Sequence, residues 1–347
     1  MRRRSPVPPA PLPQREGIDP VRVRLPADPD GVWGTVGEHL RDRFAGAVGA
    51  ARVAEMLRAG RFVGVDGALS GGEPYCAGRY VWFHRDFVPE VPVPFEVGIV
   101  HRDERIVIAD KPHFLATTPR GQHVTETALA RLRRDLGLPA LQPAHRLDRL
   151  TAGLVLFVVR PEDRGAYQGL FAARRVRKEY EAVARYEAGV ALPVTVRSRI
   201  VKERGVPAAR EVPGEVNAVS RIELVERRGG LGRYRLLPAT GRTHQLRVHM
   251  SGLGLPILND PLFPMPDEPL FPVPDRRLFP GGGGAGAGGV VGMEGFGEPL
   301  QLLARVLEFR DPVDGRERRF ESGLRLAAWD SCRREPGTGG PGEGRSD

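Results

Sequence analysis

A single carboxylate in the sequence stands between two guanidinium groups, directly before an apolar run. Asp148 lies between Arg146 and Arg149 in PAHRLDRLTAGLVLF, residues 143–157. An ionised carboxylate can act as a nucleophile or as a proton acceptor. Burial alone would raise its pKa and neutralise it, so such chemistry requires a positive charge nearby. Taken by itself, the motif fits a turn or a helix cap equally well.

Two later segments carry side chains that such a carboxylate could use. The segments RKEYEAVA and ATGRTHQLRVHM supply Lys178, Tyr180, Arg242, His244 and Arg247. Lysine is scarce in this arginine-rich chain, occurring only at Lys111, Lys178 and Lys202. Because a compact ammonium and a flat guanidinium are not interchangeable at a tight site, a lysine here marks a place where arginine would not serve.

In this order, HRLDRLTAGL, KEY and GRTHQLRVH resemble the motifs of the RluA-type RNA pseudouridine synthases. That family carries HRLD-x-x-T-[SA]-G-L, K-x-Y and G-R-T/S-H-Q-x-R-x-H. ADKP around Lys111 is similar to its N-K-P element, and LGLPILNDPLF to its G-x-P-I-x-G-D segment. The resemblance covers residues 95–326. The chain departs from the pattern at Asn259, where glycine is usual, and at His113 and Phe114, where small residues are usual.

The resemblance implies an isomerase that converts uridine in RNA to its C-glycoside isomer. The glycosidic C–N bond breaks, the uracil turns and a C–C bond forms, without a metal, nucleotide or redox cofactor. By resemblance, Asp148 is the catalytic carboxylate and Arg247 is its ion partner. Tyr180 would stack on the target uracil, because a flat ring suits an extruded base.

The resemblance also implies a set of substrate-binding residues. The target base must be turned out of the RNA stack, and Arg146 would assist by filling the gap. Arg149, Arg242 and Lys178 could meet phosphates. Lys111 and His244 complete the predicted RNA-binding set. The spacing of His244 and His249 does not suit a metal site on one helix face, so no metal is expected.

Composition agrees with an RNA partner without requiring one. The 347 residues carry a formal charge of +9, which fits either a polyanionic partner or a merely arginine-biased composition. No apolar run reaches the roughly 18 residues of a membrane helix, and MRRRSPVPPAPLP has no apolar core of a secretory signal. With two cysteines, Cys76 and Cys332, we expect a reduced, cytoplasmic protein and by default a monomer.

Shifts in composition divide the chain into segments. We expect a disordered leader over 1–30, a small S4-like RNA-binding unit over 31–88, a catalytic domain over 89–335 and a disordered tail over 336–347. The match to the S4 pattern lacks its closing part, so a plain helical cap is the alternative for 31–88. Within the catalytic domain, the Pro- and Gly-rich stretch 261–299 predicts a flexible insertion.

Periodicity predicts an α+β fold dominated by antiparallel strands. Helical spacing occurs within residues 35–60, 125–137, 162–176 and 243–254, and strand patterns occur within 61–67, 79–85, 97–112, 153–160, 178–186, 220–227 and 232–239.

Two other functions remain compatible with these residues. One is a non-catalytic RNA-binding or ribosome-assembly factor that retains an enzyme fold. The other is an N-glycoside hydrolase, which would usually need a second carboxylate to activate water. Asp260 is the only nearby candidate by motif. Within the isomerase interpretation, we expect rRNA as the substrate in preference to tRNA.

Overall fold

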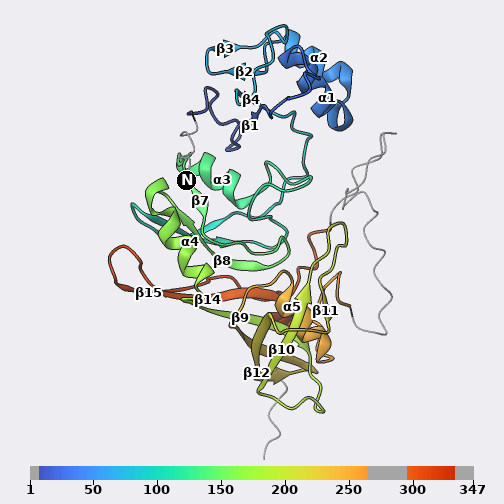
Figure 1. Cartoon of the computed structure of the whole chain (residues 1–347). Coiled ribbons are helices and arrows are strands. Elements are labelled where there is room, and N and C mark those ends of the chain that lie inside the picture. The colour runs from blue at the N-terminus through green and yellow to red at the C-terminus, as the bar shows by residue number, and fades with distance from the viewer. Residues whose placement is uncertain (1–7, 265–294, 333–347) are drawn as a thin grey trace, which may run out of the picture. The chain divides into compact units, whose positions relative to one another are not determined.

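The computed structural model describes residues 8–264 and 295–332, and the chain divides into two compact units at Pro89 (Figure 1). The middle of the predicted insertion 261–299 and the predicted tail 336–347 lie outside the described residues. Within the described ranges, no helix has both the length and the apolar composition to span a membrane.

The first unit packs two helices against a small sheet. Its elements are β1 (Val21–Arg24), α1 (Val36–Val48), α2 (Ala50–Arg58), β2 (Val63–Gly64), β3 (Gly67–Ala68) and β4 (Tyr80–Phe83). Thr35 and Glu38 form a capping box at the start of α1, and Gly49, with φ of 87°, separates the two helices. The predicted helices are confirmed, whereas the S4-like assignment stays a prediction.

The prediction of a disordered leader over 1–30 is wrong for residues 21–24. These residues form β1, which pairs with β4 in the antiparallel sheet. Val23 and Leu25 are buried in the core of the unit, whereas Arg22 and Arg24 are exposed. VRVRL thus has the alternation of a half-buried strand, which the surrounding prolines and arginines concealed.

The second unit is built on one large sheet. Its described strands follow the order β11-β10-β12-β13-β9-β14-β8-β6-β5, with β15 paired to β14 and β7 paired to β8. The strands are β5 (Gly98–Arg102), β6 (Ile106–Lys111), β7 (Gln142–Pro143), β8 (Ala152–Val158), β9 (Val176–Arg185), β10 (Val194–Val201), β11 (Arg210–Val212), β12 (Ala218–Arg228), β13 (Leu231–Pro238), β14 (Leu302–Arg310) and β15 (Glu317–Glu321). All pairs are antiparallel except β14 with β8, so the predicted mainly antiparallel α+β fold is confirmed.

Short helices cover the sheet. They are α3 (Ala128–Leu136), the 3₁₀ turn η1 (Pro161–Asp163), α4 (Arg164–Ala172), α5 (Gln245–Gly252) and α6 (Ala327–Ser331). Successive side chains of a strand point to opposite faces. Accordingly, Val155 and Phe157 of β8 pack in the cluster that includes α3, whereas Leu154 and Leu156 pack in the cluster that includes α4. Every residue of β8 is therefore buried.

Strand β14 joins the two halves of this sheet, because it lies between β8 and β9. Its contact with β8 is close and depends on glycine. Gly153 has φ of +109°, and a Cβ atom there would lie 2.3 Å from the carbonyl oxygen of Ala304. The glycine of the TAGL motif is thus required by the approach of a neighbouring backbone.

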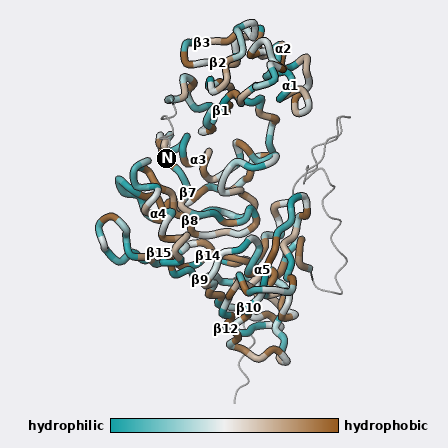
Figure 2. The backbone as a smooth tube through the Cα atoms, viewed as in Figure 1, coloured by the Kyte–Doolittle hydropathy of each residue, from teal (hydrophilic) through white to brown (hydrophobic). Residues whose placement is uncertain are grey.

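Charged residues on β14 and its partners β9 and β15 are matched across the ladder. Glu308 of β14 lies opposite Arg177 of β9 and Arg319 of β15. Its carboxylate accepts from Arg177 Nη1 at 2.7 Å and from Arg319 Nε at 2.9 Å. Figure 2 shows hydrophilic and hydrophobic stretches following one another closely along these strands. Such cross-strand pairs favour this register.

Candidate active site

Asp148 lies in the tight turn that leads into β8. Thr151 closes the turn by donating its backbone N–H to the Asp148 carbonyl oxygen at 3.2 Å. On the preceding side, Thr117 holds Leu147 twice, donating its hydroxyl to the Leu147 carbonyl at 2.8 Å and accepting the Leu147 N–H at 3.1 Å. The Asp148 side chain is 35% exposed. The turn is therefore fixed, and the carboxylate remains accessible to a substrate.

Lys111 supports the same turn from beneath. Its ammonium donates to the Arg149 carbonyl at 3.2 Å and to the carbonyls of Pro112 and Leu115 at 2.9 and 2.8 Å. The side chain is fully buried. Burial lowers the pKa of Lys111 to about 7, and the negative charge of Asp148 opposes that shift. The prediction that Lys111 contacts RNA is wrong, because its ammonium is enclosed by backbone carbonyls.

Two histidines that flank the turn serve as neutral hydrogen-bonding groups. His113 Nδ1 donates to the Leu150 carbonyl at 2.7 Å, and burial lowers its pKa to about 4. His145 Nε2 accepts the Leu156 N–H at 3.2 Å while its ring stacks on Phe171. Burial lowers the pKa of His145 to about 3. The first residue of the HRLD motif thus ties the turn to β8.

Arg247 lies on α5 and connects two carboxylates. Its Nε and Nη2 donate to Asp260 at 2.7 and 2.5 Å, and both side chains are buried. Its Nη1 lies 4.0 Å from Asp148 Oδ2. The structure therefore brings Arg247 to Asp148, as predicted, but gives its hydrogen bonds to Asp260. Sequence reasoning considered Asp260 only as a possible second acid.

His244 approaches Asp148 from the residue before α5. Its Nε2 lies 4.0 Å from Asp148 Oδ2, and its Nδ1 accepts the Ala209 N–H at 3.3 Å. An accepting Nδ1 leaves the proton of the neutral ring on Nε2, facing the carboxylate. Burial lowers the pKa of His244, and Asp148 opposes that shift. His244 also has an unusual backbone, with φ of 57°.

Phe263 contacts both groups that face Asp148. The guanidinium carbon of Arg247 lies 5.3 Å from the centre of its ring, and the His244 ring meets it edge-on at 6.0 Å. Sequence reasoning did not single out Phe263. It lies three residues after Asp260, in PLFP, and this segment falls within the proline-rich stretch that was predicted to be a flexible insertion.

Tyr180 belongs to β9, on the far side of β14 from Asp148. Its side chain packs against the apolar cluster that contains Leu147 of the Asp148 turn. Burial and, next, the charge of Asp148 raise the pKa of Tyr180. The hydroxyl therefore stays protonated at neutral pH, so the side chain can offer a ring face and a hydrogen-bond donor.

The remaining predicted RNA contacts surround this centre. Arg146 and Arg242 are exposed, and Arg242 Nε donates to the Asn217 carbonyl at 3.1 Å. Arg149 is partly buried, with Nη1 3.5 Å from the Phe114 carbonyl. Lys178 is partly buried and donates to the Thr240 carbonyl at 3.4 Å, and burial lowers its pKa. Direct RNA contact by these four residues stays a prediction.

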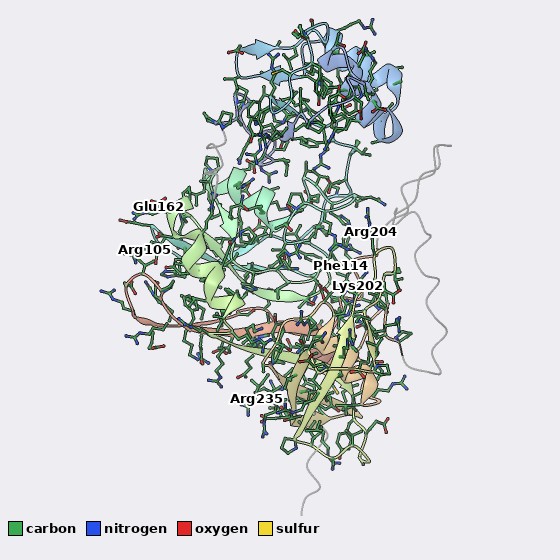
Figure 3. All side chains as sticks on the ribbon, viewed as in Figure 1. Arg105, Phe114, Glu162, Lys202, Arg204 and Arg235 are labelled. Carbon is green, nitrogen blue, oxygen red and sulfur yellow. The ribbon has the colours of Figure 1, made fainter. Side chains whose placement is uncertain are left out.

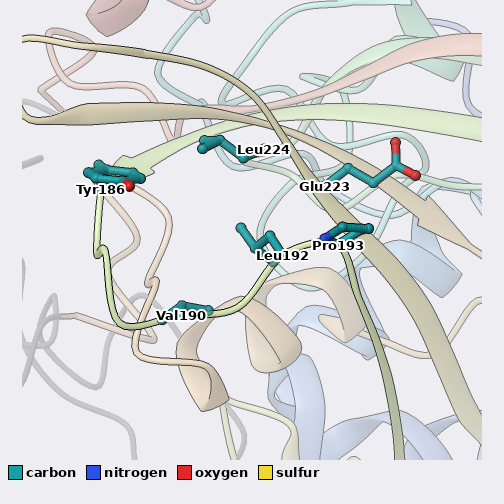
Figure 4. A pocket seen from close by; sticks show the side chains of 6 residues that line it. All are labelled: Tyr186, Val190, Leu192, Pro193, Glu223 and Leu224. Atoms are coloured by element: carbon teal, nitrogen blue, oxygen red, sulfur yellow. The ribbon is translucent and has the colours of Figure 1, made fainter.

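A surface cavity of about 470 Å³ lies elsewhere in the second unit (Figure 4). Its lining residues are Tyr186, Val190, Leu192, Pro193, Glu223 and Leu224. None of the predicted site residues is among them. Glu223 is already paired, since it accepts hydrogen bonds from Arg221 and Arg235.

Comparison with known proteins places this geometry in a family. Residues 105–252 match the model of the RNA pseudouridylate synthase family. The dual-specificity RNA pseudouridine synthase RluA of Pasteurella multocida is 33% identical over 183 residues, covering 49% of this chain and 78% of that protein. The ribosomal large subunit pseudouridine synthase D of Pseudomonas aeruginosa is 30% identical over 236 residues, covering 65% and 70%.

Among solved structures, human RNA pseudouridylate synthase domain containing 1 aligns with a TM-score of 0.46 and 22% identity, over 67% of this chain and 86% of that one. The family match spans Asp148, Tyr180 and Arg247, the residues that the sequence motifs singled out. The chain therefore belongs to the RluA-type RNA pseudouridine synthases, the isomerases that convert uridine in RNA to pseudouridine.

Proposed function

We propose that this chain isomerises specific uridines of structured RNA, and of rRNA in preference to tRNA, with Asp148 as the catalytic carboxylate. The main support is the convergence on Asp148 of two side chains from α5 and its cap. Arg247 Nη1 and His244 Nε2 both lie 4.0 Å from the same carboxylate oxygen, Oδ2. The Arg247 guanidinium thus brings a positive charge close to this carboxylate without using it up in a direct hydrogen bond.

The reaction rearranges one molecule without adding or removing atoms. The bond between C1′ and N1 breaks, a bond between C1′ and C5 forms, and the proton of C5 is replaced by one on N1. Asp148 acts as a nucleophile or as a proton acceptor in this sequence. Tyr180 supplies a stacking face for the extruded uracil. The proposal needs no cofactor, because nothing is oxidised and no group is transferred to another molecule.

Several side chains would hold the RNA around the extruded base. Arg146 is exposed on the catalytic turn, where it can fill the gap that the uracil leaves. Arg149, Arg242 and Lys178 would face phosphates. The exposed Lys202 and Arg204, labelled in Figure 3, belong to the connection between β10 and β11. Lys202 acts electrostatically on His244. The loop between β10 and β11 is therefore a further candidate for contacts with the phosphate backbone of the RNA.

The preference for rRNA rests on the relatives. The match to the ribosomal large subunit pseudouridine synthase D extends over 65% of this chain, further than the 49% of the dual-specificity RluA. The first unit would add affinity as an S4-like RNA-binding module, and its exposed Arg22 and Arg24 support that role. A monomer acting in the cytoplasm completes the proposal.

The hydrolase alternative is less well supported by the same geometry. A hydrolase would need a second carboxylate that can reach water. The Asp260 side chain is buried and bound to Arg247 through both oxygens, and it also accepts the Leu262 N–H at 2.9 Å. A carboxylate so occupied is not available to activate water.

Pseudouridine mapping of total RNA tests the proposal. We expect at least one rRNA pseudouridine to disappear when the gene is deleted and to return with the wild-type gene or with Glu162→Gln, an exposed acid labelled in Figure 3. Asp148→Asn should not restore it, although that protein should still fold and bind RNA. Full restoration by Asp148→Asn would refute the role of Asp148.

The same maps, together with an assay for free uracil, distinguish the isomerase from a non-catalytic RNA-binding factor and from a hydrolase. A non-catalytic factor would leave every pseudouridine in place after deletion. A hydrolase would release free uracil from the RNA, which chromatography of the reaction mixture detects. A lost tRNA pseudouridine with intact rRNA would overturn the substrate preference.

A further inference from the structure

Three phenylalanines form an aromatic cluster in the second unit. Phe95 and Phe114 stack with ring centres 6.3 Å apart and an interplanar angle of 22°. Phe296 meets Phe95 edge-on at 6.1 Å and Phe114 edge-on at 5.3 Å. These geometries are the favourable ones for aromatic pairs. The three residues come from the linker before β5, the turn after β6 and the segment before β14, so the fold assembles the cluster from distant parts of the chain.

The backbone of Phe114 is unfavourable for its side chain. Its φ is 65°, in the left-handed region that a bulky residue rarely adopts. Such strain persists only where the surroundings impose it, and it is concentrated at functional sites. The chain therefore holds a large ring in a turn whose geometry would suit glycine or asparagine.

The cluster is joined directly to the catalytic turn. Arg149 Nη1 lies 3.5 Å from the Phe114 carbonyl oxygen, and the adjacent His113 donates to the Leu150 carbonyl. Phe114 and Phe296 also belong to the apolar cluster that contains Leu147 and Tyr180. The apolar cluster that contains Phe114 thus also packs against Phe296 and against Tyr180, the ring expected to hold the target uracil.

Part of the aromatic cluster is open to solvent. Phe95 is 39% exposed and Phe296 is partly exposed, whereas Phe114 is 8% exposed and supports them. Arg146 is exposed on the adjoining turn. Flat apolar rings, joined through Phe114 to a turn that carries Arg146 and Arg149, match a nucleotide, which combines a flat base with an anionic phosphate. An apolar peptide would match the rings but not the cations.

We propose that Phe95 and Phe296, supported by Phe114, form a second base-stacking subsite for an unpaired nucleobase that neighbours the target uridine in the RNA. This inference rests on the proposed function, because it places the substrate RNA on the catalytic turn. Stacking uses the face that every base possesses, so the subsite selects an unpaired loop over a duplex without reading its sequence.

Binding measurements on the full-length Asp148→Asn protein test the subsite without turnover. The probe is a fluorescein-labelled RNA hairpin with a loop of uridines, and the comparator is a fully paired duplex with the same stem sequence. Fluorescence anisotropy gives the Kd of each. We expect Phe95→Leu and Phe296→Leu to weaken hairpin binding about five- to hundredfold and duplex binding hardly at all. The dependence of Kd on salt should not change, because no phosphate contact is removed.

Two further variants distinguish stacking from support of the fold. Phe95→Trp keeps a flat ring and should restore hairpin affinity. Phe320→Leu, on β15, removes a ring that packs on His101 and Phe309 instead, and should leave hairpin affinity unchanged. Thermal melting identifies any variant that is partly unfolded. The affinity of such a variant is calculated from the concentration of its folded protein.

The outcomes separate this proposal from the proposed function. Equal hairpin affinities of Phe95→Leu, Phe95→Trp and the parent protein would overturn the subsite, and so would equal losses on hairpin and duplex. If deletion of the gene changes no pseudouridine while Phe95→Leu still weakens hairpin binding selectively, the function is wrong and the subsite stands.

Discussion

Asp260 holds one edge of the Arg247 guanidinium through two hydrogen bonds and leaves Nη1 facing Asp148 at 4.0 Å. A planar fork bound on one edge cannot rotate, so its remaining nitrogen is aimed. The buried carboxylate of Asp260 thereby fixes the position of the Arg247 charge relative to the more accessible carboxylate of Asp148. Removing one partner of such a buried pair typically costs 3–5 kcal/mol, because the other charge is left uncompensated.

Asp260→Asn should impair catalysis by releasing Arg247. We expect kcat on the mapped RNA substrate to fall about a hundredfold, since misplacement by about 1 Å is enough for that loss. Steady-state kinetics, expressed per folded protein, measures the effect. Asp311→Asn is the matched control, because Asp311 is equally buried but bonds to the Tyr167 hydroxyl. A normal kcat in Asp260→Asn, or an equal loss in both variants, would contradict the positioning role.

Lys111→Met should destabilise the protein and alter its response to pH. The change leaves three buried carbonyls without their donor, at about 1–3 kcal/mol each. The pKa of Lys111 is lowered to about 7 in the folded chain, so between that pH and about 10.4 the unfolded chain binds more protons. Stability from this group therefore rises with pH across that window.

Urea unfolding at pH 7 and pH 9.5 measures both effects. The wild type should gain stability between these values relative to Lys111→Met, which lacks the titrating group. Lys202→Met replaces an exposed lysine and should stay within about 0.5 kcal/mol of the wild type. Parallel pH profiles for wild type and Lys111→Met would show that Lys111 does not titrate in this range.

Gly153→Ala should prevent the close pairing of β8 with β14. The new methyl would lie 2.3 Å from the Ala304 carbonyl oxygen, at a φ of +109° that alanine avoids. We expect a loss of at least about 3 kcal/mol, comparable to other severe core changes. Gly165→Ala, in an exposed part of α4 with open space around it, should instead stabilise by about 0.5–1 kcal/mol. Chemical denaturation with far-UV circular dichroism decides between these outcomes.

Acid should weaken the turn that carries Asp148. The pKa of His145 is lowered to about 3, whereas in the unfolded chain it lies near 6.5. Because the unfolded chain binds more protons between these values, stability falls as the pH falls through this window. The contribution is about 3 kcal/mol between pH 7 and pH 4, at about 1.4 kcal/mol per pH unit. In His145→Gln this slope should be reduced, and an unchanged slope would assign the acid sensitivity to other groups.

The sequence predicts much of this fold because its periodicities are local. The buried run of β8 and the helix ended by Gly137 follow from neighbouring residues alone. Strand β1 was missed because prolines and arginines flank a four-residue alternation. Strands β10 and β11 were not predicted either, although β10 alternates in burial along VTVRSRIV. Their pairing depends on partners far along the chain, which local patterns do not specify.

The site was predicted in its residue types and only partly in its contacts. The motifs identify Asp148, His244 and Arg247, and the structure brings these three together. The motifs do not reveal that Asp260 accepts the hydrogen bonds of Arg247, because that depends on which edge of the guanidinium is buried. Lys111 was assigned to RNA binding by resemblance, although the fold buries its ammonium beneath the turn. Burial is a property of the assembled fold.

The position of β14 has a consequence for synthesis of the chain. The turn before β8 carries Asp148 and β9 carries Tyr180, on either side of β14, yet β14 follows both strands by more than a hundred residues. Until residues 302–310 leave the ribosome, the two half-sheets have no shared strand and present unpaired edges. Such long-range pairing is slow, and open edges favour aggregation. We therefore expect the site to appear late and all at once, with nascent chains that stop before β14 inactive and dependent on chaperones.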